Sequence, residues 1–395
     1  MQHFANGGEL QGEIDRWLDC HVAPLAGTES RGFTEWRSEV AGPLFIYGAG
    51  GLGRKLASGL RAEGVAIAGF CDSNPATWGR HMLDLPVMSP HAAAAGDSGG
   101  FIISTWSLGA ESRNAEIKRT LDQLGVKHST FFTTPFWEYP RQFLPHYRID
   151  LPSKLLAARG DILEAAGLLA DAESRRQFFV QLEMLATTTF NELSYDTPGD
   201  TYFPAGIVSP LMIKRFVDCG AYDGDTLKSL FAHAGDSLEK YWGFEPDPGN
   251  VMRLRATADA MALGRDGRAE ILPYAVGSEN RRLRFDATGD VGARVSADGA
   301  IEVECRRLDD ELAGAAPTFI KMDIEGAELD AIAGARSLLS RHRPACAVCV
   351  YHYQDHLWNV PLVLHASLPG HTIWFRAHAA TFDVVCYASP IGHPP

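Results

Sequence analysis

Two strand-and-turn segments constrain the fold of this chain more than any other feature. Residues Phe216–Thr226 form an apolar strand that runs into an acidic turn, and residues Gly243–Pro246 end a second strand on the carboxylate of Glu245. The turn contains Gly220 and Gly224, which lack a Cβ and so allow a bound ligand to come close to the backbone. Glu245 follows Gly220 by 25 residues, about the spacing at which a nucleotide-binding α/β unit places the acidic residue that holds ribose hydroxyls. The pattern therefore predicts an α/β fold and a ligand that carries ribose.

The charge of the turn restricts the ligand further. Asp218, Asp223 and Asp225 lie in the turn, which contains no Lys or Arg. Three carboxylates would repel a pyrophosphate, because like charges at short range are unfavourable. S-adenosylmethionine carries ribose, a sulfonium and an ammonium but no phosphate, and it is the cofactor that the turn predicts.

Acidic and aromatic segments also follow later strands of the C-terminal half. Phe319–Glu328 places Asp323 directly after an apolar strand, and Tyr351–His356 contains His352. Ligands of a doubly wound sheet bind outside the carboxyl ends of its strands. We therefore expect these side chains to converge with Glu245 on one rim of the sheet.

Each of these residues also has a purely structural interpretation. An Asp before an amphipathic helix is often an N-cap, and Glu325 and Glu328 would be favoured by the helix dipole in the first turn. His352 could be a satisfied rim residue beside Tyr351. The residues alone leave these alternatives open.

A second glycine turn lies in the N-terminal half. Pro43–Tyr47 predicts a strand, and Gly48, Gly50 and Gly53 follow it in the spacing G-x-G-x-x-G. A further strand ends on Asp72, 24 residues after the first glycine. This is a full dinucleotide-type fingerprint in the strand–turn–helix context, in which the second glycine would let a phosphate approach the helix N-terminus. These three glycines and Asp72 form a candidate nucleotide site.

Hydrophobic periodicity extends the alternation of strands and helices over both halves. Besides the strands above, we expect strands at Ala66–Cys71, Phe101–Thr105, Ala269–Val276, Arg282–Asp286, Ile301–Arg307 and Ala345–Tyr351, and a closing antiparallel hairpin from Thr372–Arg376 and Phe382–Ala388. We expect helices at Glu9–Cys20, Leu52–Glu63, Glu111–Gly125, Leu227–Ala232, Pro248–Ala260 and Glu325–Leu339, and a mostly helical segment at Lys154–Asn191.

Composition excludes several classes of function. The net charge of −13 argues against a nucleic-acid partner. The seven cysteines are scattered, and Cys346 and Cys349 form the single C-x-x-C, without a second pair of zinc ligands, so we expect no metal site and a reducing, cytoplasmic location. Residues Met1–Asp15 lack the features of a signal peptide. Residues His356–Phe375 are uncharged, but prolines and histidines interrupt them, so we expect no membrane span.

The C-terminal half resembles the FkbM family of S-adenosylmethionine-dependent methyltransferases. The resemblance covers residues 195–390, about half of the chain, and its motifs are FVDCGAYDGDT from Phe216, GFEPDP from Gly243, RLDD from Arg307 and, most specifically, IKMDIEGAE from Ile320. It implies a class I, Rossmann-like fold and O-methylation, usually of a sugar, glycan or polyketide hydroxyl. One departure is Tyr222, which stands where many relatives carry Asn.

The resemblance implies a role for each motif residue. We expect the cofactor to contact Asp218, Gly220, Ala221, Tyr222, Gly224, Thr226, Glu245, Pro246 and Asp323. An alcohol acceptor must lose its proton near the transition state, and His352 and Asp323 are the candidate general bases. The substrate would be a small molecule or a glycan.

Residues 41–135 resemble the N-terminal nucleotide-sugar-binding-like domain of bacterial sugar acyltransferases. The segments that carry this resemblance are IYGAGGLG from Ile46 and GFCDSNP from Gly69. A ligand there would be a nucleotide or nucleotide-sugar rather than NAD, because no substrate domain for hydride chemistry follows. This domain would present substrate or stabilise a homodimer.

The sequence thus predicts two Rossmann-like units in four segments. We expect an N-terminal helical extension at 1–40, a nucleotide-binding-type domain at 41–135, a linker and helical segment at 136–210, and a methyltransferase domain at 211–395. Two other functions remain as alternatives: an NAD-dependent oxidoreductase that uses the N-terminal glycine turn, and a non-catalytic nucleotide-sugar-binding module.

Overall fold

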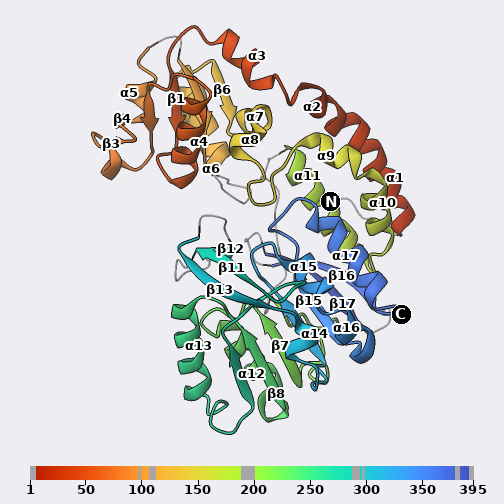
Figure 1. Ribbon diagram of the computed structural model, residues 1–395. Helices are drawn as coiled ribbons and strands as arrows, with labels where there is room; N and C mark the ends of the chain where they lie inside the picture. The colour runs from red at the N-terminus through yellow and green to blue at the C-terminus, as the bar shows by residue number, and fades with distance from the viewer. Residues whose placement is uncertain are drawn as a thin grey trace. The chain divides into compact units, whose positions relative to one another are not determined.

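A computed structural model describes residues 6–96, 99–105, 113–187, 201–286, 294–295, 299–378 and 383–390. The chain forms two compact units, each discontinuous in sequence (Figure 1). Unit 1 comprises Met1–Glu13, Gly160–Phe179 and Asp196–Pro395, and unit 2 comprises Ile14–Arg159 and Val180–Tyr195. Each unit contains its own mostly parallel sheet, so the predicted pair of α/β units is confirmed.

The sheet of unit 2 has six strands in the order β3-β4-β2-β1-β5-β6. All neighbours pair in parallel except β3 and β4. The strands are β1 (Leu44–Tyr47), β2 (Gly69–Cys71), β3 (His81–Met82), β4 (Leu85–Met88), β5 (Gly100–Ile103) and β6 (His128–Phe131). Every residue of β1 is buried, because its alternate side chains enter hydrophobic clusters on opposite faces of the sheet.

Helices precede, connect and follow these strands. They are α1 (Gly7–Trp17), the π-helix η1 (Leu18–Val22), α2 (Ala23–Thr28), α3 (Gly32–Glu39), α4 (Gly51–Ala62), the short 3₁₀ helix η2 (Pro75–Thr77), α5 (Pro90–Ala93), α6 (Arg113–Gln123), α7 (Thr133–Glu138), α8 (Pro140–Phe143), α9 (Pro152–Ala157), α10 (Arg159–Gly167) and α11 (Ala172–Thr187). The helices expected near the N-terminus and after the N-terminal glycine turn are therefore present, with ends shifted by a few residues.

The main sheet of unit 1 has seven strands in the order β16-β17-β15-β14-β7-β8-β9. Its strands are β7 (Arg215–Cys219), β8 (Lys240–Phe244), β9 (Ala269–Leu272), β14 (Phe319–Met322), β15 (Ala345–Cys349), β16 (Thr372–Ala377) and β17 (Val384–Ser389). The first five run parallel, and β17 pairs antiparallel with both β15 and β16, which confirms the closing hairpin. The strand order reverses between β7 and β14, and this switch point is where such sheets bind ligands.

Aromatic packing fixes the centre of this sheet. Phe216 of β7 and Phe319 of β14 are register partners, and their rings stack with centroids 5.1 Å apart. Both side chains are fully buried in one large hydrophobic cluster. This packing aligns the ends of β7 and β14, from which the candidate site is built.

A smaller sheet, in the order β10-β13-β11-β12, also belongs to unit 1. Its strands are β10 (Ala275–Val276), β11 (Arg281–Asp286), β12 (Arg294–Val295) and β13 (Ile301–Arg306). The run of strand character that the sequence predicts after the third main strand corresponds to β11 and β13, which pair antiparallel.

The helices of unit 1 that follow β7 correct two expectations; most of α10 and parts of α1 and α11, given above, also belong to this unit. The helices after β7 are α12 (Asp225–Ala234), the 3₁₀ helix η3 (Gly235–Ser237), α13 (Pro248–Ala260), α14 (Leu308–Glu311), α15 (Glu328–Ala333), α16 (Arg336–His342) and α17 (His356–Ser367). The predicted single helix Glu325–Leu339 is two helices, and Gly334 lies at the break, where a Cβ on it would lie 2.0 Å from the carbonyl oxygen of Gly277. Helix α17 was not predicted, since Pro361 and the histidines obscured its pattern.

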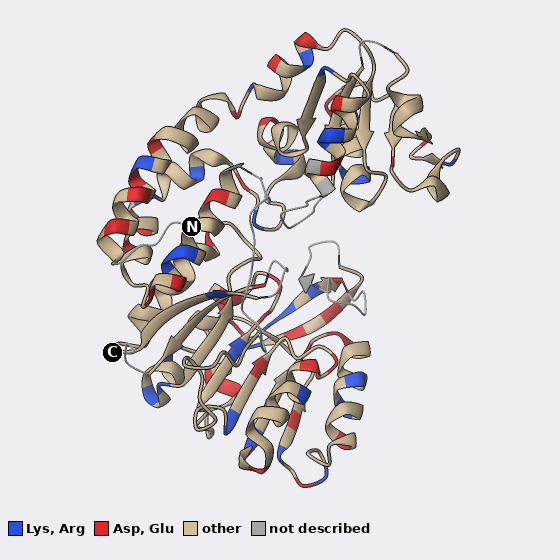
Figure 2. Cartoon of the chain, turned by 180° about the vertical axis from the view of Figure 1, so that it is seen from behind, with Lys and Arg blue, Asp and Glu red and all other residues tan. Residues whose placement is uncertain are grey.

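The structure shows where the charged residues and the Cys346–Cys349 pair lie, and whether any helix could cross a membrane. Figure 2 shows acidic and basic positions interspersed along the helices of each unit. Among the described helices, none has the length and apolar content needed to cross a bilayer. Cys346 and Cys349 are free thiols buried in β15, as a core strand predicts.

Candidate functional site

The turn after β7 requires glycine for packing against the protein itself. Gly220 has a φ of 81°, and a Cβ on it would lie 1.9 Å from the carbonyl oxygen of Asp323. Gly224 has a φ of 90°, and its Cβ would lie 2.8 Å from the side chain of Thr257. Both glycines therefore allow the ends of neighbouring elements to meet, and the contact of a ligand with their backbone stays a prediction.

Alanine at position 220 should destabilise unit 1 strongly. A left-handed backbone costs a non-glycine residue about 1–2 kcal/mol, and relieving a clash in a packed site costs about 1–3 kcal/mol more. Gly206 is a matched control, because its φ is 83° and a Cβ there would meet nothing within 4 Å. We expect urea denaturation to show a larger loss of unfolding free energy for Gly220→Ala than for Gly206→Ala. Equal losses would contradict the packing explanation.

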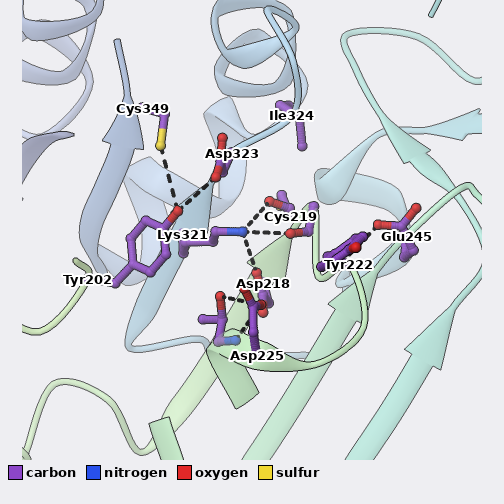
Figure 3. Close-up of polar contacts among 12 residues, drawn as sticks. Tyr202, Asp218, Cys219, Tyr222, Asp225, Glu245, Lys321, Asp323, Ile324 and Cys349 are labelled. Atoms are coloured by element: carbon purple, nitrogen blue, oxygen red, sulfur yellow. Dashed lines mark hydrogen bonds and ion pairs between the residues drawn. The ribbon is translucent and has the colours of Figure 1, made fainter. Parts of the chain in front are cut away.

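Asp218 is paired with a lysine of the neighbouring strand. The Lys321 Nζ lies 3.0 Å from Oδ1 of Asp218 and donates a hydrogen bond to the carbonyl oxygen of Gly220 at 2.6 Å (Figure 3). The Tyr241 hydroxyl donates to the second oxygen of Asp218 at 2.9 Å. Burial alone would lower the pKa of Lys321, but the Asp218 carboxylate raises it above its ordinary value, so the lysine stays charged.

This pair changes the electrostatic argument drawn from the sequence. The turn contains no cation of its own, but Lys321 of β14 neutralises one of its three carboxylates. The other two, Asp223 and Asp225, bind backbone N–H groups of the turn, and Asp225 accepts from the amide of Thr226 at 2.6 Å. The remaining negative field therefore comes from two carboxylates rather than three.

Glu245, at the end of β8, reaches back to the glycine turn. Its Oε2 accepts a hydrogen bond from the amide of Tyr222 at 3.0 Å, and its Oε1 accepts from the amide of Asp247 at 2.8 Å. Burial raises the pKa of Glu245, and these amides offset the rise only in part. The sequence places this carboxylate correctly beside the turn, and its oxygens retain further lone pairs for a ligand.

Tyr222 adopts a backbone conformation that is rare for its residue type. Its φ is 47°, in the left-handed region. Its ring lies 5.8 Å from the guanidinium of Arg253, on helix α13. Figure 3 shows the ring beside Glu245, so Tyr222 lines the same turn. By contrast Ala221 is fully buried in the core, Thr226 is buried and Pro246 is half-buried.

Asp323, directly after β14, accepts hydrogen bonds from two tyrosines. The hydroxyl of Tyr202 donates to Oδ2 at 2.8 Å, and that of Tyr351 donates to Oδ1 at 2.9 Å. Burial alone would raise the pKa of Asp323, but Lys321 and His352 lower it overall. The carboxylate is therefore ionised, and the side chain is 24% exposed.

The alternative in which Asp323 only caps a helix is wrong. Helix α15 begins at Glu328, and its N-cap residue Ala327 makes no side-chain cap. The Glu328 carboxylate instead accepts the amide of Ile324 at 2.9 Å. Asp323 therefore does not cap helix α15, and its carboxylate faces Tyr202 (Figure 3).

His352 is buried among carboxylates. Its Nε2 lies 3.5 Å from Oδ1 of Asp323 and 3.8 Å from Oε1 of Glu325, and its Nδ1 lies 2.8 Å from Oε1 of Glu328. Burial lowers the pKa of His352, but the three carboxylates, Glu328 above all, raise it to about 9. The second oxygen of Glu328 lies 3.2 Å from Nδ1 of His356. The structure thus brings His352 and Asp323 together, as the positions of their strands predict.

Sequence reasoning missed three contributors to this site. Lys321 belongs to the motif IKMDIEGAE, and a cation in the middle of an otherwise apolar strand could have indicated that it has a buried partner. Tyr202 comes from a proline-rich loop that has no periodic pattern, so nothing local could identify it. Glu328 lies in the first turn of helix α15, as the sequence predicts, but its contacts with two histidines were not predicted.

The N-terminal glycine turn has the expected local geometry. A Cβ on Gly53 would lie 2.0 Å from the carbonyl oxygen of Gly48, whereas one on Gly50 would meet nothing within 4 Å. Asp72 binds the turn through Oδ2, which accepts the amide of Ala49 at 2.8 Å. Its Oδ1 accepts the amide of Asn74 at 2.8 Å. The carboxylate that the fingerprint assigns to a ribose therefore also holds the turn in place.

Comparison with known proteins identifies the C-terminal part of the chain. Residues 218–371 match the family model described as the methyltransferase FkbM domain, so this segment is an FkbM methyltransferase domain. The 2-O-methyltransferase NoeI of Sinorhizobium fredii (strain NBRC 101917 / NGR234) is 32% identical over 124 residues, which cover 25% of this chain and 49% of that protein. The chain thus spans about half the length of this curated relative.

One solved structure resembles nearly the whole chain. Methyltransferase FkbM from Methylobacillus flagellatus KT aligns with a TM-score of 0.76 and 22% identity, covering 96% of this chain and all of that one. This likeness supports the fold, including the arrangement of a methyltransferase-type sheet in unit 1. The resemblance of residues 41–135 to sugar acyltransferases remains a prediction.

Proposed function

We propose that this protein transfers the methyl group of S-adenosylmethionine to a hydroxyl oxygen of a sugar, a glycan or a related small molecule. The observation that carries the proposal is the convergence of three strand ends at the switch point of one sheet. Strand β7 supplies the glycine turn, β8 supplies Glu245 and β14 supplies Asp323. The methyltransferase FkbM domain covers all three.

The donor set fits S-adenosylmethionine. The oxygens of Glu245 lie beside the amide of Tyr222 and can accept hydrogen bonds from ribose hydroxyls. Asp223 and Asp225 provide negative charge for the ammonium or sulfonium, and they disfavour a pyrophosphate. When bound, S-adenosylmethionine supplies an electrophilic methyl group.

The residues of the chain must then align the acceptor and take up its proton. Orienting two reactants can lower a barrier by about 7–11 kcal/mol in well-oriented systems. His352, with a pKa of about 9, is already protonated at neutral pH, whereas the pKa of Asp323 is lowered. We therefore propose that the ionised carboxylate of Asp323 takes up the proton of the substrate hydroxyl. The protonated His352 would keep that carboxylate in place.

A sugar hydroxyl is the favoured acceptor. The support is the name of the relative, a 2-O-methyltransferase, together with the general need of an alcohol for a nearby proton acceptor. The test is to incubate the full chain with radiolabelled S-adenosylmethionine and a panel of saccharides that carry free or blocked hydroxyls. Transfer only to carboxylates or amines would contradict the hydroxyl assignment.

Removing the Glu245 carboxylate should weaken cofactor binding strongly. Glu245→Ala loses the ribose acceptor and frees the amide of Tyr222, so we expect S-adenosylhomocysteine affinity to fall at least about 100-fold, as for the loss of two charged hydrogen bonds. Isothermal titration calorimetry measures this directly. Glu279→Ala, at an exposed position, is the matched control and should bind as the wild type does. Unchanged affinity in Glu245→Ala would sink the proposed site.

The N-terminal glycine turn supports a second, separate binding function. Gly50 leaves open space at the start of helix α4, and its neighbours pack as in phosphate-binding turns. We infer that this turn accepts a nucleotide or nucleotide-sugar. Titration of uridine diphosphate and of NADH into Gly50→Val and wild-type protein checks this, because the added side chain would fill the space a phosphate needs. NADH binding without S-adenosylhomocysteine binding would favour an oxidoreductase instead.

A further inference from the structure

Tyr353 is exposed although both of its neighbours in the chain are buried. It is 38% exposed, whereas His352 and Gln354 are each 4% exposed. Among the described residues of unit 1, no other Phe, Tyr or Trp is as open to solvent. A single exposed ring is common on protein surfaces, so its meaning depends on what holds it and on what lies beside it.

The backbone of Gly326 holds the ring of Tyr353 from one side. Gly326 has a φ of 101°, and a Cβ on it would lie 2.2 Å from Cε2 of that ring. Any other residue at this position would therefore displace the ring. The ring of His356 contacts it edge-on, with the two centroids 5.3 Å apart. Tyr353 is thus packed against two parts of the protein and is still exposed.

The turn that carries Gly326 also carries the proposed proton acceptor. Asp323 lies three residues before Gly326, and its side chain is 24% exposed. Glu325, between them, has a φ of 55°, a backbone conformation that is unfavourable for a non-glycine residue and that clusters at functional sites. Glu328 holds the turn by accepting hydrogen bonds from the amides of Ile324 at 2.9 Å and Gly326 at 3.5 Å. This strained turn therefore places the aromatic ring within a few residues of an accessible carboxylate.

A second link joins the same ring and carboxylate. The residue before Tyr353 is His352, whose Nε2 lies 3.5 Å from Oδ1 of Asp323. Tyr351, one residue earlier, donates a hydrogen bond from its hydroxyl to the same oxygen at 2.9 Å. The segment after β15 therefore contributes two residues that hold Asp323 and, directly after them, the exposed ring. Because β14 and β15 run parallel, both links place the ring beside the carboxylate at the carboxyl end of the sheet.

An aromatic ring beside a carboxylate suits the two kinds of surface that a sugar presents. The C–H groups on the face of a pyranose are polarised by the neighbouring oxygens, and the negative π face of an aromatic ring attracts them. The hydroxyls point outward from the edge of the pyranose, where a carboxylate can accept a hydrogen bond or a proton. Tyr353 and Asp323 thus offer one partner for each surface.

We propose that Tyr353 binds the pyranose ring of the acceptor on its aromatic face and so places one sugar hydroxyl at Asp323. This inference rests on the proposed transfer to a sugar hydroxyl, and it assigns the residue that positions the sugar. Tyr353 takes up no proton in this scheme, because stacking requires only its ring. Loss of the ring weakens the binding of the sugar equally in the ground state and in the transition state, which raises KM and leaves kcat nearly unchanged.

The test measures methyl transfer by the full chain from radiolabelled S-adenosylmethionine to the methyl pyranosides of glucose, galactose and mannose, with 1-naphthol as a planar phenol. We expect Tyr353→Ala and Tyr353→Leu to raise KM for a pyranoside about tenfold, the size of a good aromatic contact, and Tyr353→Phe to stay near the wild type. Leucine keeps an apolar side chain but has no π face. Val363→Ala, at an exposed apolar position on helix α17 of the same unit, is the matched control and should keep the wild-type KM.

The kcat and the affinity for S-adenosylhomocysteine, measured on the same variants, separate this inference from the proposed function. A wild-type KM in Tyr353→Leu overturns the stacking, and so does a Tyr353→Ala variant in which kcat and cofactor affinity fall together with acceptor binding. Transfer to 1-naphthol and to no pyranoside overturns both the stacking and the sugar acceptor, but it leaves the methyl-donor site standing. A wild type that binds no S-adenosylhomocysteine contradicts the proposed function, and the inference fails with it.

Discussion

Replacing Asp323 by Asn is expected to lower kcat for methyl transfer by about 10²–10⁴-fold, the usual contribution of a positioned proton acceptor. An amide has nearly the same shape, but it neither accepts a proton nor carries the charge that His352 faces. The affinity for S-adenosylhomocysteine should change only a few-fold, because Glu245 and the glycine turn remain. Steady-state kinetics and calorimetry on the same variant measure both quantities.

Two phenylalanine variants serve as controls for this prediction. Tyr202→Phe and Tyr351→Phe each remove one hydroxyl that orients Asp323 and leave the carboxylate in place. Each should lower kcat less than Asp323→Asn does. If the asparagine variant keeps full activity, or if kcat and cofactor affinity fall together by the same factor, Asp323 is not the proton acceptor.

Replacing Lys321 by Met should lower the unfolding free energy by about 3–5 kcal/mol, since it leaves a buried carboxylate without its partner. Asp218 is fully buried, and only the Tyr241 hydroxyl and the lysine contact its oxygens among the described residues. The carbonyl oxygen of Gly220 also loses its donor. Urea denaturation monitored by circular dichroism measures the loss.

The double variant Lys321→Met with Asp218→Asn shows whether the cost comes from the stranded charge. Neutralising the carboxylate should recover a large part of the stability that the single variant loses. Lys228→Met, at an exposed position on helix α12, should leave stability nearly unchanged. A double variant as unstable as Lys321→Met alone would show that packing, rather than charge, dominates.

Local pattern predicted most of the fold. Strands β7, β8 and β14 are apolar runs that are followed by a glycine or a carboxylate, and the closing hairpin follows from two short, largely apolar runs. The break between α15 and α16 was not predicted, and the Gly334 residue at the break packs against Gly277, which is distant in sequence. Helix α17 was not predicted for a different reason. Its interior Pro361 argues against a helix when only the local sequence is considered.

The candidate site was predictable in position but not in its chemistry. That Glu245 and Asp323 share one rim follows from the rule that parallel strands present their carboxyl ends together. That Lys321 cancels the charge of Asp218 depends on the pairing of β14 with β7. That His352 is surrounded by carboxylates depends on the segment after β15 meeting the segment after β14 and the first turn of α15. Such pairings are set by register, which sequence periodicity alone does not fix.

The interleaving of the two units has a consequence for how such a protein can evolve. The chain passes between unit 1 and unit 2 four times. Within unit 1, Ser174 accepts the amide of Phe375, and Asp171 pairs with Arg376 at 2.6 Å, so the early segment Gly160–Phe179 secures strand β16 near the end of the chain. Neither unit is one continuous segment of the chain. Exchanging a unit by recombination would therefore require several crossover points at the same time. We therefore expect the pair to be inherited together and to diversify by point substitution at its rims.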